Sequence, residues 1–432
     1  MPEADLTSRL RDEVDRGFER QVEFLREFVR IPSLRGCEAP AQDFMARALR
    51  ERGYAVDEWT IDPDDICHLP GFSPVAVDYG QARTVVGSHR PDRVRGRSLI
   101  LQGHCDVVPE GPRAMWTRPP FEPAIDGGWM YGRGAGDMKA GTVAALFALD
   151  AIARLGLEPA ATVHFQSVIE EESTGNGALS TLQRGYRAEC CLIPEPTAHS
   201  LIRAQVGVLW FRIRVRGRPV HVAQAGTGAN AIRATAPLIE ALDALERRWN
   251  ERARAHPQFG AMEHPVNFNP GRIRGGDWAS SVPAWCELDC RIAILPGWPI
   301  AEAQAEVEAA VREASSAHPF LRENPPEIEW NGFLADGYVL EDAADQERAL
   351  AAAHRAVLGA PMGEILATGL NDTRFYGLYH GIPGLCWGPV AENIHGFDER
   401  VDLESIRRCT QVLALFVADW CGVQERPARP AP

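Results

Sequence analysis

Apolar residues recur at helical spacing near the start of the chain. The positions that follow this spacing are Phe18, Val22, Leu25, Phe28 and Val29. The spacing predicts a helix that ends before the sequence IPS at 31–33, because proline cannot continue a helix. A second helix is predicted over 41–52, where Gly53 follows, and a third over the alanine-rich segment 138–155, where Gly156 follows.

Three short apolar runs predict buried strands in the first half of the chain. They are SLILQGHCDVV at 98–108, ATVHFQSVI at 161–169 and ECCLIPEPT at 189–197. Each run passes into polar or acidic residues at its carboxyl end. Strands that alternate with helices indicate an α/β sheet covered by helices, and such sheets place their functional groups at the carboxyl ends of the strands.

The pattern changes near residue 206. The sequence VGVLWFRIRVRGRPVHV (206–222) alternates apolar residues with arginine, which predicts a strand with one solvated face. A helix over 229–255, a strand over 285–296 and a helix over 301–314 follow. Together these elements predict a smaller α+β domain inserted into the first one.

We therefore expect an α/β protein whose main domain is interrupted by an insertion. The expected boundaries are 1–205 and 324–422 for the two parts of the main domain, and 206–323 for the inserted domain. Residues 423–432 include the proline-rich sequence RPARPAP and are expected to be disordered.

Composition and charge argue against several kinds of partner. The 432 residues carry a formal net charge of −14, which disfavours binding to nucleic acid and to anionic membranes. The charged N-terminus lacks the apolar core of a signal peptide, and no apolar run reaches the roughly 18 residues of a membrane span. The ten cysteines include no CxxC pair, so we expect buried free thiols in a reducing cytoplasm.

Histidine and acidic residues lie where the predicted strands end and in nearby turns. In chain order the candidates are His104, Asp106, Asp137, Glu170, Glu171, Glu172, Glu195 and His395. The three adjacent acids repel one another unless cations compensate their charge. Imidazole and carboxylate groups are ligands for hard to borderline divalent metals. Lys139, the only lysine of the chain, stands two residues after Asp137.

The order of these motifs resembles the cocatalytic metallohydrolase family of acetylornithine deacetylase, succinyl-diaminopimelate desuccinylase, aminoacylase and glutamate carboxypeptidase. The motifs that carry the resemblance are GHCDVVPEG (103–111), YGRGAGDMKAG (131–141), IEEES (169–173), PEPT (194–197), GRPVHVAQAGTGANAI (217–232), ELDCRI (287–292), NDTRFY (371–376) and GPVAENIHGFDE (388–399). It implies an exopeptidase-like catalytic domain with a central mixed sheet between helices, and a lid or dimerisation domain inserted into it.

The resemblance implies a centre of two divalent metal ions. Zn²⁺ is the expected metal, and Co²⁺ or Mn²⁺ can substitute for it. Carried over position by position, the first ion would be held by His104, Asp137 and Glu195, and the second by Asp137, Glu172 and His395. Asp137 would then bridge the two ions.

The resemblance also implies a glutamate that acts as general base, and two residues compete for this role. Glu171 matches the base, and Glu170 matches the acid that precedes it in the family. Two residues instead of one separate the acidic triplet from Gly175, so a shift that makes Glu170 the base and Glu171 a ligand stays open. Asp106 would lie behind His104 and orient its ring.

Further residues match positions that bind substrate in the family. His221 matches a histidine of the inserted domain, often supplied by the partner subunit, that stabilises the oxyanion. Arg291 matches an arginine that binds a substrate carboxylate. Ser280 stands where family members often have asparagine, so we expect the substrate to be oriented differently. Additional substrate contacts are expected from Asn230, Thr368 and Gly369.

The activity that the resemblance implies is hydrolysis of the amide bond in a small N-acylated amino acid, as in acetylornithine deacetylation. A metal-bound hydroxide would attack, with a glutamate as base. A dipeptidase or carboxypeptidase with the same metals, and hydrolytic deamination of an unusual amine, are the alternatives within enzymes. A binding protein that keeps the fold without catalysis is the alternative outside them. Besides a small-molecule substrate, the expected partner is a second copy of the chain, bound through the inserted domain.

Overall fold

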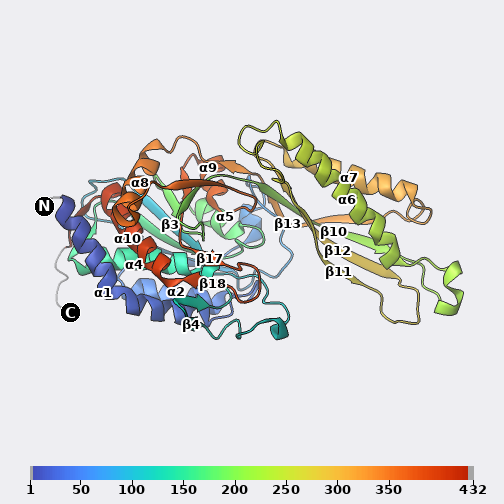
Figure 1. Ribbon diagram of the computed structural model, residues 1–432, viewed down its shortest axis with the longest axis horizontal. Helices are drawn as coiled ribbons and strands as arrows, with labels where there is room; N and C mark the ends of the chain where they lie inside the picture. The colour runs from blue at the N-terminus through green and yellow to red at the C-terminus, as the bar shows by residue number, and fades with distance from the viewer. Residues whose placement is uncertain (1–2, 427–432) are drawn as a thin grey trace.

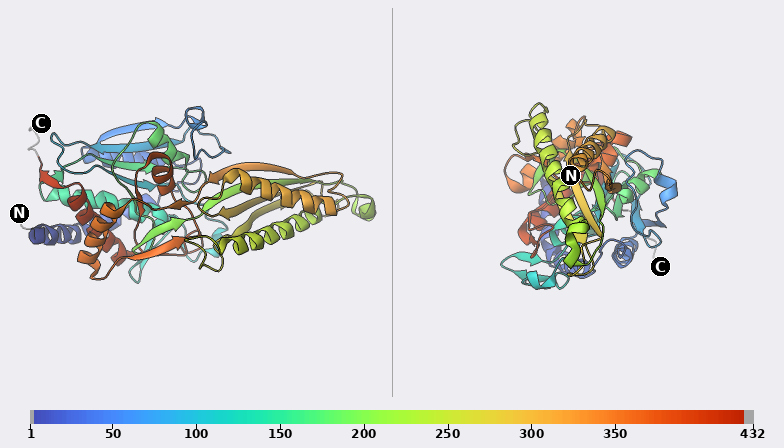
Figure 2. Two further views of the ribbon diagram at one scale, coloured as in Figure 1. Left: turned by 90° about the horizontal axis from the view of Figure 1, so that it is seen from above. Right: turned by 90° about the vertical axis from the view of Figure 1, so that its right-hand side faces the viewer.

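The computed structural model describes residues 3–426, which form two bodies placed end to end (Figure 1). The first and last described segments, α1 and β19, belong to the larger body. The smaller body contains α6 (Ala231–Ala253) and α7 (Ile300–Ala317). Figure 2 shows that it projects from the larger body as a narrow extension.

A six-stranded mixed sheet forms the centre of the larger body. In spatial order its strands are β1 (Ala55–Thr60), β2 (Arg83–His89), β7 (Val163–Val168), β3 (Leu99–His104), β8 (Cys191–Ile193) and β16 (Gly384–Cys386). The last four are parallel, whereas β2 is antiparallel to both of its neighbours. Strands β7, β3 and β8 are buried along their whole length, as parallel strands covered on both faces are.

Helices cover this sheet, so the expected α/β fold is confirmed. They are α1 (Glu3–Val29), α2 (Ala39–Glu51), α3 (Pro63–Ile66), α4 (Ala140–Arg154), α5 (Asn176–Gln183), α8 (Ala344–Leu358), α9 (Thr373–His380) and α10 (Leu403–Trp420). Two glycines let α4 approach the sheet. A Cβ atom on Gly103 would lie 2.1 Å from the Oγ1 atom of Thr142, and one on Gly141 would lie 1.7 Å from the carbonyl oxygen of Pro194. The turn before α4 therefore lies close to the carboxyl ends of β3 and β8.

The smaller body is built on a four-stranded antiparallel sheet with its own apolar core. In spatial order its strands are β11 (Phe268–Gly275), β12 (Trp285–Ile294), β10 (Gly207–Arg216) and β13 (Glu327–Ala335). Along β10, Phe211 and Ile213 are buried in the core shared with α6 and α7. Arg212, between these two residues, and Arg214, directly after Ile213, form ion pairs with acidic residues of β12. The predicted alternation of buried and solvated positions is thus confirmed.

Three small sheets and several tight turns complete the fold. The sheets are β14 (Tyr338–Val339), β9 (Ser200–Gln205) and β15 (Gly363–Ala367); β17 (Ala391–Glu392), β18 (Arg400–Asp402), β5 (Trp129–Tyr131) and β4 (Ala124–Asp126); and β19 (Val423–Glu425) with β6 (Leu157–Pro159). The turns are η1 (Arg113–Met115), η2 (Ala135–Lys139) and η3 (Val222–Thr227). The segment after β5 and the loop between β17 and β18 matter most, because both lead to candidate site residues.

The structure corrects three of the expectations. The strand expected over 98–108 ends at His104, so Asp106 lies beyond it. The boundary expected at residue 323 is too early, because β13 pairs with β10 in the smaller body. Disorder from residue 423 onward is wrong for β19, which pairs with β6, while 427–432 lie outside the described residues. No helix of the described chain is long and apolar enough to cross a membrane.

Candidate metal centre

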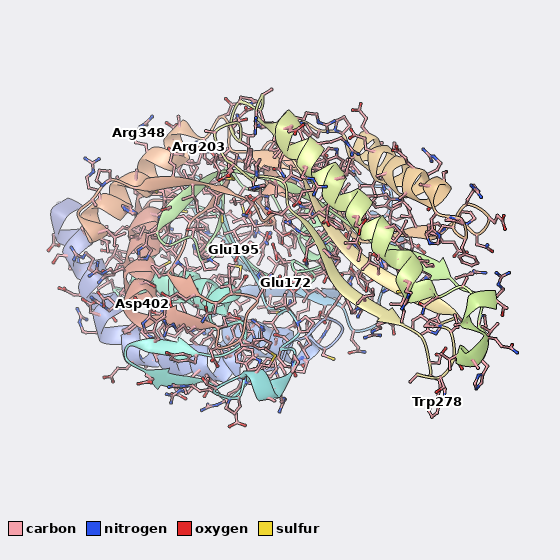
Figure 3. The ribbon with its side chains drawn as sticks, turned by 45° about the vertical axis from the view of Figure 1, so that its right-hand side comes forward. Glu172, Glu195, Arg203, Trp278, Arg348 and Asp402 are labelled. Carbon is pink, nitrogen blue, oxygen red and sulfur yellow. The ribbon has the colours of Figure 1, made fainter. Side chains whose placement is uncertain are left out.

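The candidate ligands converge at the carboxyl ends of the parallel strands. His104 is the last residue of β3, the acidic triplet 170–172 follows β7, and Glu195 follows β8. Asp137 lies in η2, immediately ahead of α4, and His395 lies in the loop between β17 and β18. Figure 3 places the side chains of Glu172 and Glu195 within the larger body.

The first group of donors surrounds the Nε2 atom of His104. This atom lies 3.3 Å from Oδ1 of Asp137, 3.7 Å from Oε1 of Glu195 and 3.8 Å from Oε2 of Glu171. The other ring nitrogen, Nδ1, lies 2.9 Å from the backbone carbonyl oxygen of Asp106. Donation from Nδ1 to this carbonyl leaves Nε2 free to bind a cation, which is how metal-binding histidines are usually held.

The second group of donors surrounds the Nε2 atom of His395. It lies 3.1 Å from Oε2 of Glu172 and 3.3 Å from Oδ2 of Asp137. Asp137 therefore directs one carboxylate oxygen to His104 and the other to His395. One aspartate shared between two histidine-containing groups is the arrangement that two neighbouring divalent ions require.

The electrostatics of the site also fit cations. In the described part of the chain, no lysine or arginine forms an ion pair with the four clustered carboxylates, which are Asp137, Glu171, Glu172 and Glu195. Burial raises the pKa of the three glutamates. The carboxylate of Glu172 and then Asp137 raise the pKa of His395 to about 11. Donor atoms of His104, Glu171 and Glu195 lie within 4.8 Å of one another, and so do donor atoms of His104, Asp137 and Glu172, close enough in each case to hold one ion.

The contacts of Glu170 distinguish it from the rest of the triplet. It accepts hydrogen bonds from Nε and Nη2 of Arg35 at 2.6 and 2.8 Å, and from the hydroxyl of Tyr79 at 2.6 Å. Its charge is therefore already compensated inside the protein. Glu171, in contrast, faces His104 and forms no ion pair with an arginine or lysine among the described residues, which favours Glu171 over Glu170 as the residue that handles protons.

Asp106 lies beside His104, but its carboxylate is not the nearest acceptor. Its Oδ1 atom is 3.5 Å from Nδ1 of the histidine, farther than its own backbone carbonyl, and has no hydrogen-bond partner. Its Oδ2 atom accepts a hydrogen bond of 3.1 Å from the backbone N–H of Glu172. Asp106 thus connects the histidine of the first group to the backbone of a ligand of the second.

The candidates of the inserted domain lie together but apart from the metal ligands. The backbone N–H of Val222, next to His221, donates to the carbonyl of Ser280 at 3.0 Å, and Asn230 caps the start of α6. Figure 3 shows the neighbouring Trp278 at the far end of the inserted domain. In the described chain no hydrogen bond or ion pair joins these residues to the metal ligands.

Arg291 lies on β12 and contacts backbone rather than acid. Its Nη2 atom donates to the carbonyl of Thr368 at 2.9 Å, and Nη1 donates to that of Asn267 at 3.3 Å. Burial lowers the pKa of Arg291, and no carboxylate offsets the effect. The structure therefore joins Arg291 to the segment Thr368–Gly369, and leaves the guanidinium without an ion pair among the described residues.

Other polar residues near the site were not predicted. Lys139 is fully buried, and its Nζ atom donates to the carbonyls of Phe28 and Ile31 at 3.1 and 2.8 Å, so it caps the end of α1. Its uniqueness in the sequence signalled a special environment without revealing which one. A buried pair, Arg133 with Glu399, lies beside Asp137. Both members fall within motifs quoted above, but nothing in the sequence pairs them.

Known proteins resemble this chain in sequence and in fold. The profile of Peptidase family M20/M25/M40 matches residues 100–419. The chain is 29% identical over 406 residues to N-formyl-4-amino-5-aminomethyl-2-methylpyrimidine deformylase from Halalkalibacterium halodurans, with 90% of each chain covered. It is 30% identical over 357 residues to succinyl-diaminopimelate desuccinylase from Alkalilimnicola ehrlichii, covering 78% of this chain and 88% of that one.

Among solved structures, the di-peptidase Dug1p from Saccharomyces cerevisiae superimposes with a TM-score of 0.79 at 15% identity, and 98% and 99% of the two chains are covered. At this identity the likeness establishes the fold. The family match covers well over half of the sequence. The chain belongs to peptidase family M20/M25/M40 and is a metal-dependent amidohydrolase.

Metal binding is expected to release protons, because the metal-free ligands hold them. Burial alone would lower the pKa of His104, but the neighbouring carboxylates, first Asp106 and Asp137, raise it well above its usual value. With the pKa of His395 also raised, to about 11, both imidazoles carry a proton at pH 7.5 that a metal must displace. We expect release of about one proton per ion.

Titration calorimetry of the metal-free protein with Zn²⁺, in buffers of different ionisation enthalpy, measures this number. Release is expected to fall as the pH approaches 11, where His395 gives up its proton without a metal. Binding heats that do not depend on the buffer at pH 7.5 would contradict the description of the ligands.

Proposed function

We propose that this enzyme hydrolyses the amide bond of a small N-acylated amino acid, in the manner of acetylornithine deacetylase. One observation carries the proposal: Asp137 directs its two oxygens to two histidines, and Glu171 lies beside His104 with no ion pair to lysine or arginine among the described residues. This arrangement can hold a water molecule next to an acyl carbonyl and remove its proton.

The ligands assigned to the two ions are the two groups described above. His104, Asp137 and Glu195 would hold one ion, and Asp137, Glu172 and His395 the other. We propose Zn²⁺, because mixed imidazole and carboxylate donors suit it, while Co²⁺ or Mn²⁺ can replace it. When bound, the ions would lower the pKa of water so that hydroxide is available near neutral pH, and would polarise the carbonyl group of the substrate.

Glu171 is assigned as the general base. Its carboxylate takes a proton from the attacking water and delivers it to the nitrogen of the departing amine, so the C–N bond breaks as a neutral amine leaves. Burial raises the pKa of Glu171 well above its usual value. A carboxyl group with a raised pKa both accepts a proton from water and gives it up again near neutral pH, as this role requires.

Arg291 is assigned to the carboxylate of the substrate. Its guanidinium is half-buried, is fixed by the Thr368 carbonyl and lacks an acidic partner among the described residues. A guanidinium in this state binds a carboxylate strongly, through two parallel hydrogen bonds. We assign the adjacent Gly369 to the same wall of the substrate site.

A homodimer is proposed to complete the site. His221 lies on the inserted domain, where it pairs with Ser281, and among the described residues it has no hydrogen bond or ion pair to the metal ligands of its own chain. Strand β11 is an edge strand of the sheet in that domain. Exposed apolar side chains surround this edge: Val222, Ile232, Ile273 and Trp278. Burying them against a second copy would bring the partner's His221, with Asn230 and Ser280 beside it, to the substrate.

The choice of substrate has further candidates. Deformylation of an N-formyl aminopyrimidine is favoured by the similarity to the named deformylase and by Ser280 at a position where the family often has asparagine. A dipeptidase, a carboxypeptidase and a hydrolytic deaminase would use the same centre. We also propose a cytoplasmic location, which the ten free thiols, most of them buried, support.

The substrate class can be measured directly. Zn²⁺-loaded protein is incubated with N-acetyl, N-succinyl and N-formyl amino acids, an N-formyl aminomethylpyrimidine and a set of dipeptides, and the released amine is quantified. We expect turnover of one N-acyl amino acid series. Preference for the formylated pyrimidine would select the second candidate, and preference for dipeptides the third. Turnover of none of them by protein with bound metal would contradict the proposal.

The variant Glu171→Gln tests the assigned base. It keeps the size of the side chain but cannot accept a proton, so kcat should fall by about 100- to 10,000-fold with metal content unchanged. Glu170→Gln serves as the comparison, because Glu170 is bound by Arg35 and should leave kcat within about tenfold of the wild type. A larger loss of kcat in Glu170→Gln would reverse the two roles.

Mixing two inactive variants tests the role of the partner subunit. His221→Ala and Glu171→Gln dimers are each expected to be nearly inactive. If His221 acts across the dimer, each hybrid has one site with both residues intact. Random exchange of subunits should then restore roughly a quarter of the wild-type activity. No recovery, with exchange confirmed by native mass spectrometry, would place His221 in its own chain's site or outside the reaction.

A further inference from the structure

A buried ion pair lies between two segments that carry metal ligands. The Nη1 atom of Arg133 donates to Oε2 of Glu399 at 2.5 Å, and the two side chains are only 2% and 1% exposed. The pair is separated by 266 residues in the sequence. It belongs neither to the ligands nor to the groups assigned to substrate above.

Each member of the pair also holds backbone next to a ligand. The other carboxylate oxygen of Glu399, Oε1, accepts hydrogen bonds from the backbone N–H groups of Gly136 and Asp137 at 2.9 and 3.1 Å. The Nη2 atom of Arg133 donates to the carbonyl of Gly396 at 2.9 Å. Gly396 follows His395 directly, so the pair contacts the backbone at or beside two of the three ligands of the second group, Asp137 and His395.

The loop that carries His395 needs such an external contact. Asn393, His395 and Asp398 all have positive φ angles, of 56°, 62° and 55°, which non-glycine residues rarely adopt. Residues in this region are strained and persist where their surroundings hold them. The side chain of His395 is itself 55% exposed, so packing in the core does not fix it.

The first group of ligands is held differently. His104 ends a buried strand of the central sheet, and Glu195 follows β8 in the same sheet. Neither residue has a hydrogen bond to Arg133 or Glu399 in the described chain. The pair contacts the first group only through the backbone of the shared Asp137, whereas in the second group it contacts the backbone at Asp137 and beside His395. Loss of the pair should therefore affect the second group more than the first.

We propose that the pair Arg133–Glu399 is a positioning element for the second metal site: it sets the separation of Asp137 and His395 and so the affinity for the second ion. The inference rests on the proposed two-metal centre. Outer residues that orient metal ligands typically change metal affinity by 10- to 100-fold when they are replaced. If the pair served only general stability, its replacement would lower the folding stability and leave the ratio of the two metal affinities unchanged.

The test is a Zn²⁺ titration of metal-free protein against a competing chelator, which resolves the two affinities. Glu399→Gln keeps the shape of the side chain and removes its charge. We expect the second affinity to fall by about 10- to 100-fold and the first to change by less than about threefold. Glu392→Gln is the matched control, because Glu392 pairs with Arg400 on β17 and β18 of the neighbouring sheet but is exposed. It should leave both affinities unchanged.

Arg133→Lys provides an independent variant in case Glu399→Gln does not fold. It keeps a buried cation next to Glu399 but loses the planar guanidinium that also donates to the Gly396 carbonyl. The affinity for the second ion should therefore fall in the same selective way. Circular dichroism of the metal-free variants checks folding. Equal loss at both sites, or no loss in a folded variant, would overturn the inference. Failure of the wild type to bind a second ion would instead overturn the proposed two-metal function.

Discussion

Uncompensated negative charge inside the protein is the constraint on which the rest of the site depends. Four carboxylates from three segments converge beside two histidines, and in the described chain none of them forms an ion pair with a lysine or arginine. Such a cluster is unfavourable unless protons or cations neutralise it. Glu170 shows the contrast, because this neighbouring acid is neutralised within the protein by Arg35. The carboxylates that no lysine or arginine neutralises are therefore the ones available to bind metal ions.

The framework around the cluster explains how the fold maintains this charge. The central sheet fixes His104 and Glu195 at adjacent strand ends. Because Gly103 and Gly141 have no side chain, α4 packs closely against these strands, and Asp137 just before α4 lies near His104 and Glu195. Lys139 joins the same turn to the end of α1. The loop of His395 is the part least fixed by packing, which is why the pair beside it can matter for one ion more than for the other.

Long helices and strands were predictable from the sequence because their apolar residues form a clear pattern. Short strands and domain boundaries were not predictable, because they depend on tertiary contacts. The helices α1 and α6 and the strands β10 and β12 show a period, whereas α4 and β7 were recognisable as an alanine-rich and an apolar run. Strands of two or three residues, such as β17 and β18, have no period to detect. β13 was assigned to the wrong domain, because its pairing with β10 links positions more than a hundred residues apart.

The site shows the same division. The candidate ligands were recognisable because their types and order stand out at strand ends. The choice between Glu170 and Glu171 needed Arg35, and the pair Arg133–Glu399 needed coordinates, because a contact across 266 residues leaves no local pattern. Residues that bind an ion must be particular types, whereas residues that hold those ligands can come from anywhere in the chain.

The central claim is that two ions share Asp137. Anomalous diffraction at the zinc edge, from crystals of Zn²⁺-loaded protein, tests it most directly. The account predicts two peaks, roughly 3.5–4 Å apart, with one beside each carboxylate oxygen of Asp137. A single peak, or a second peak that does not contact Asp137, would contradict it.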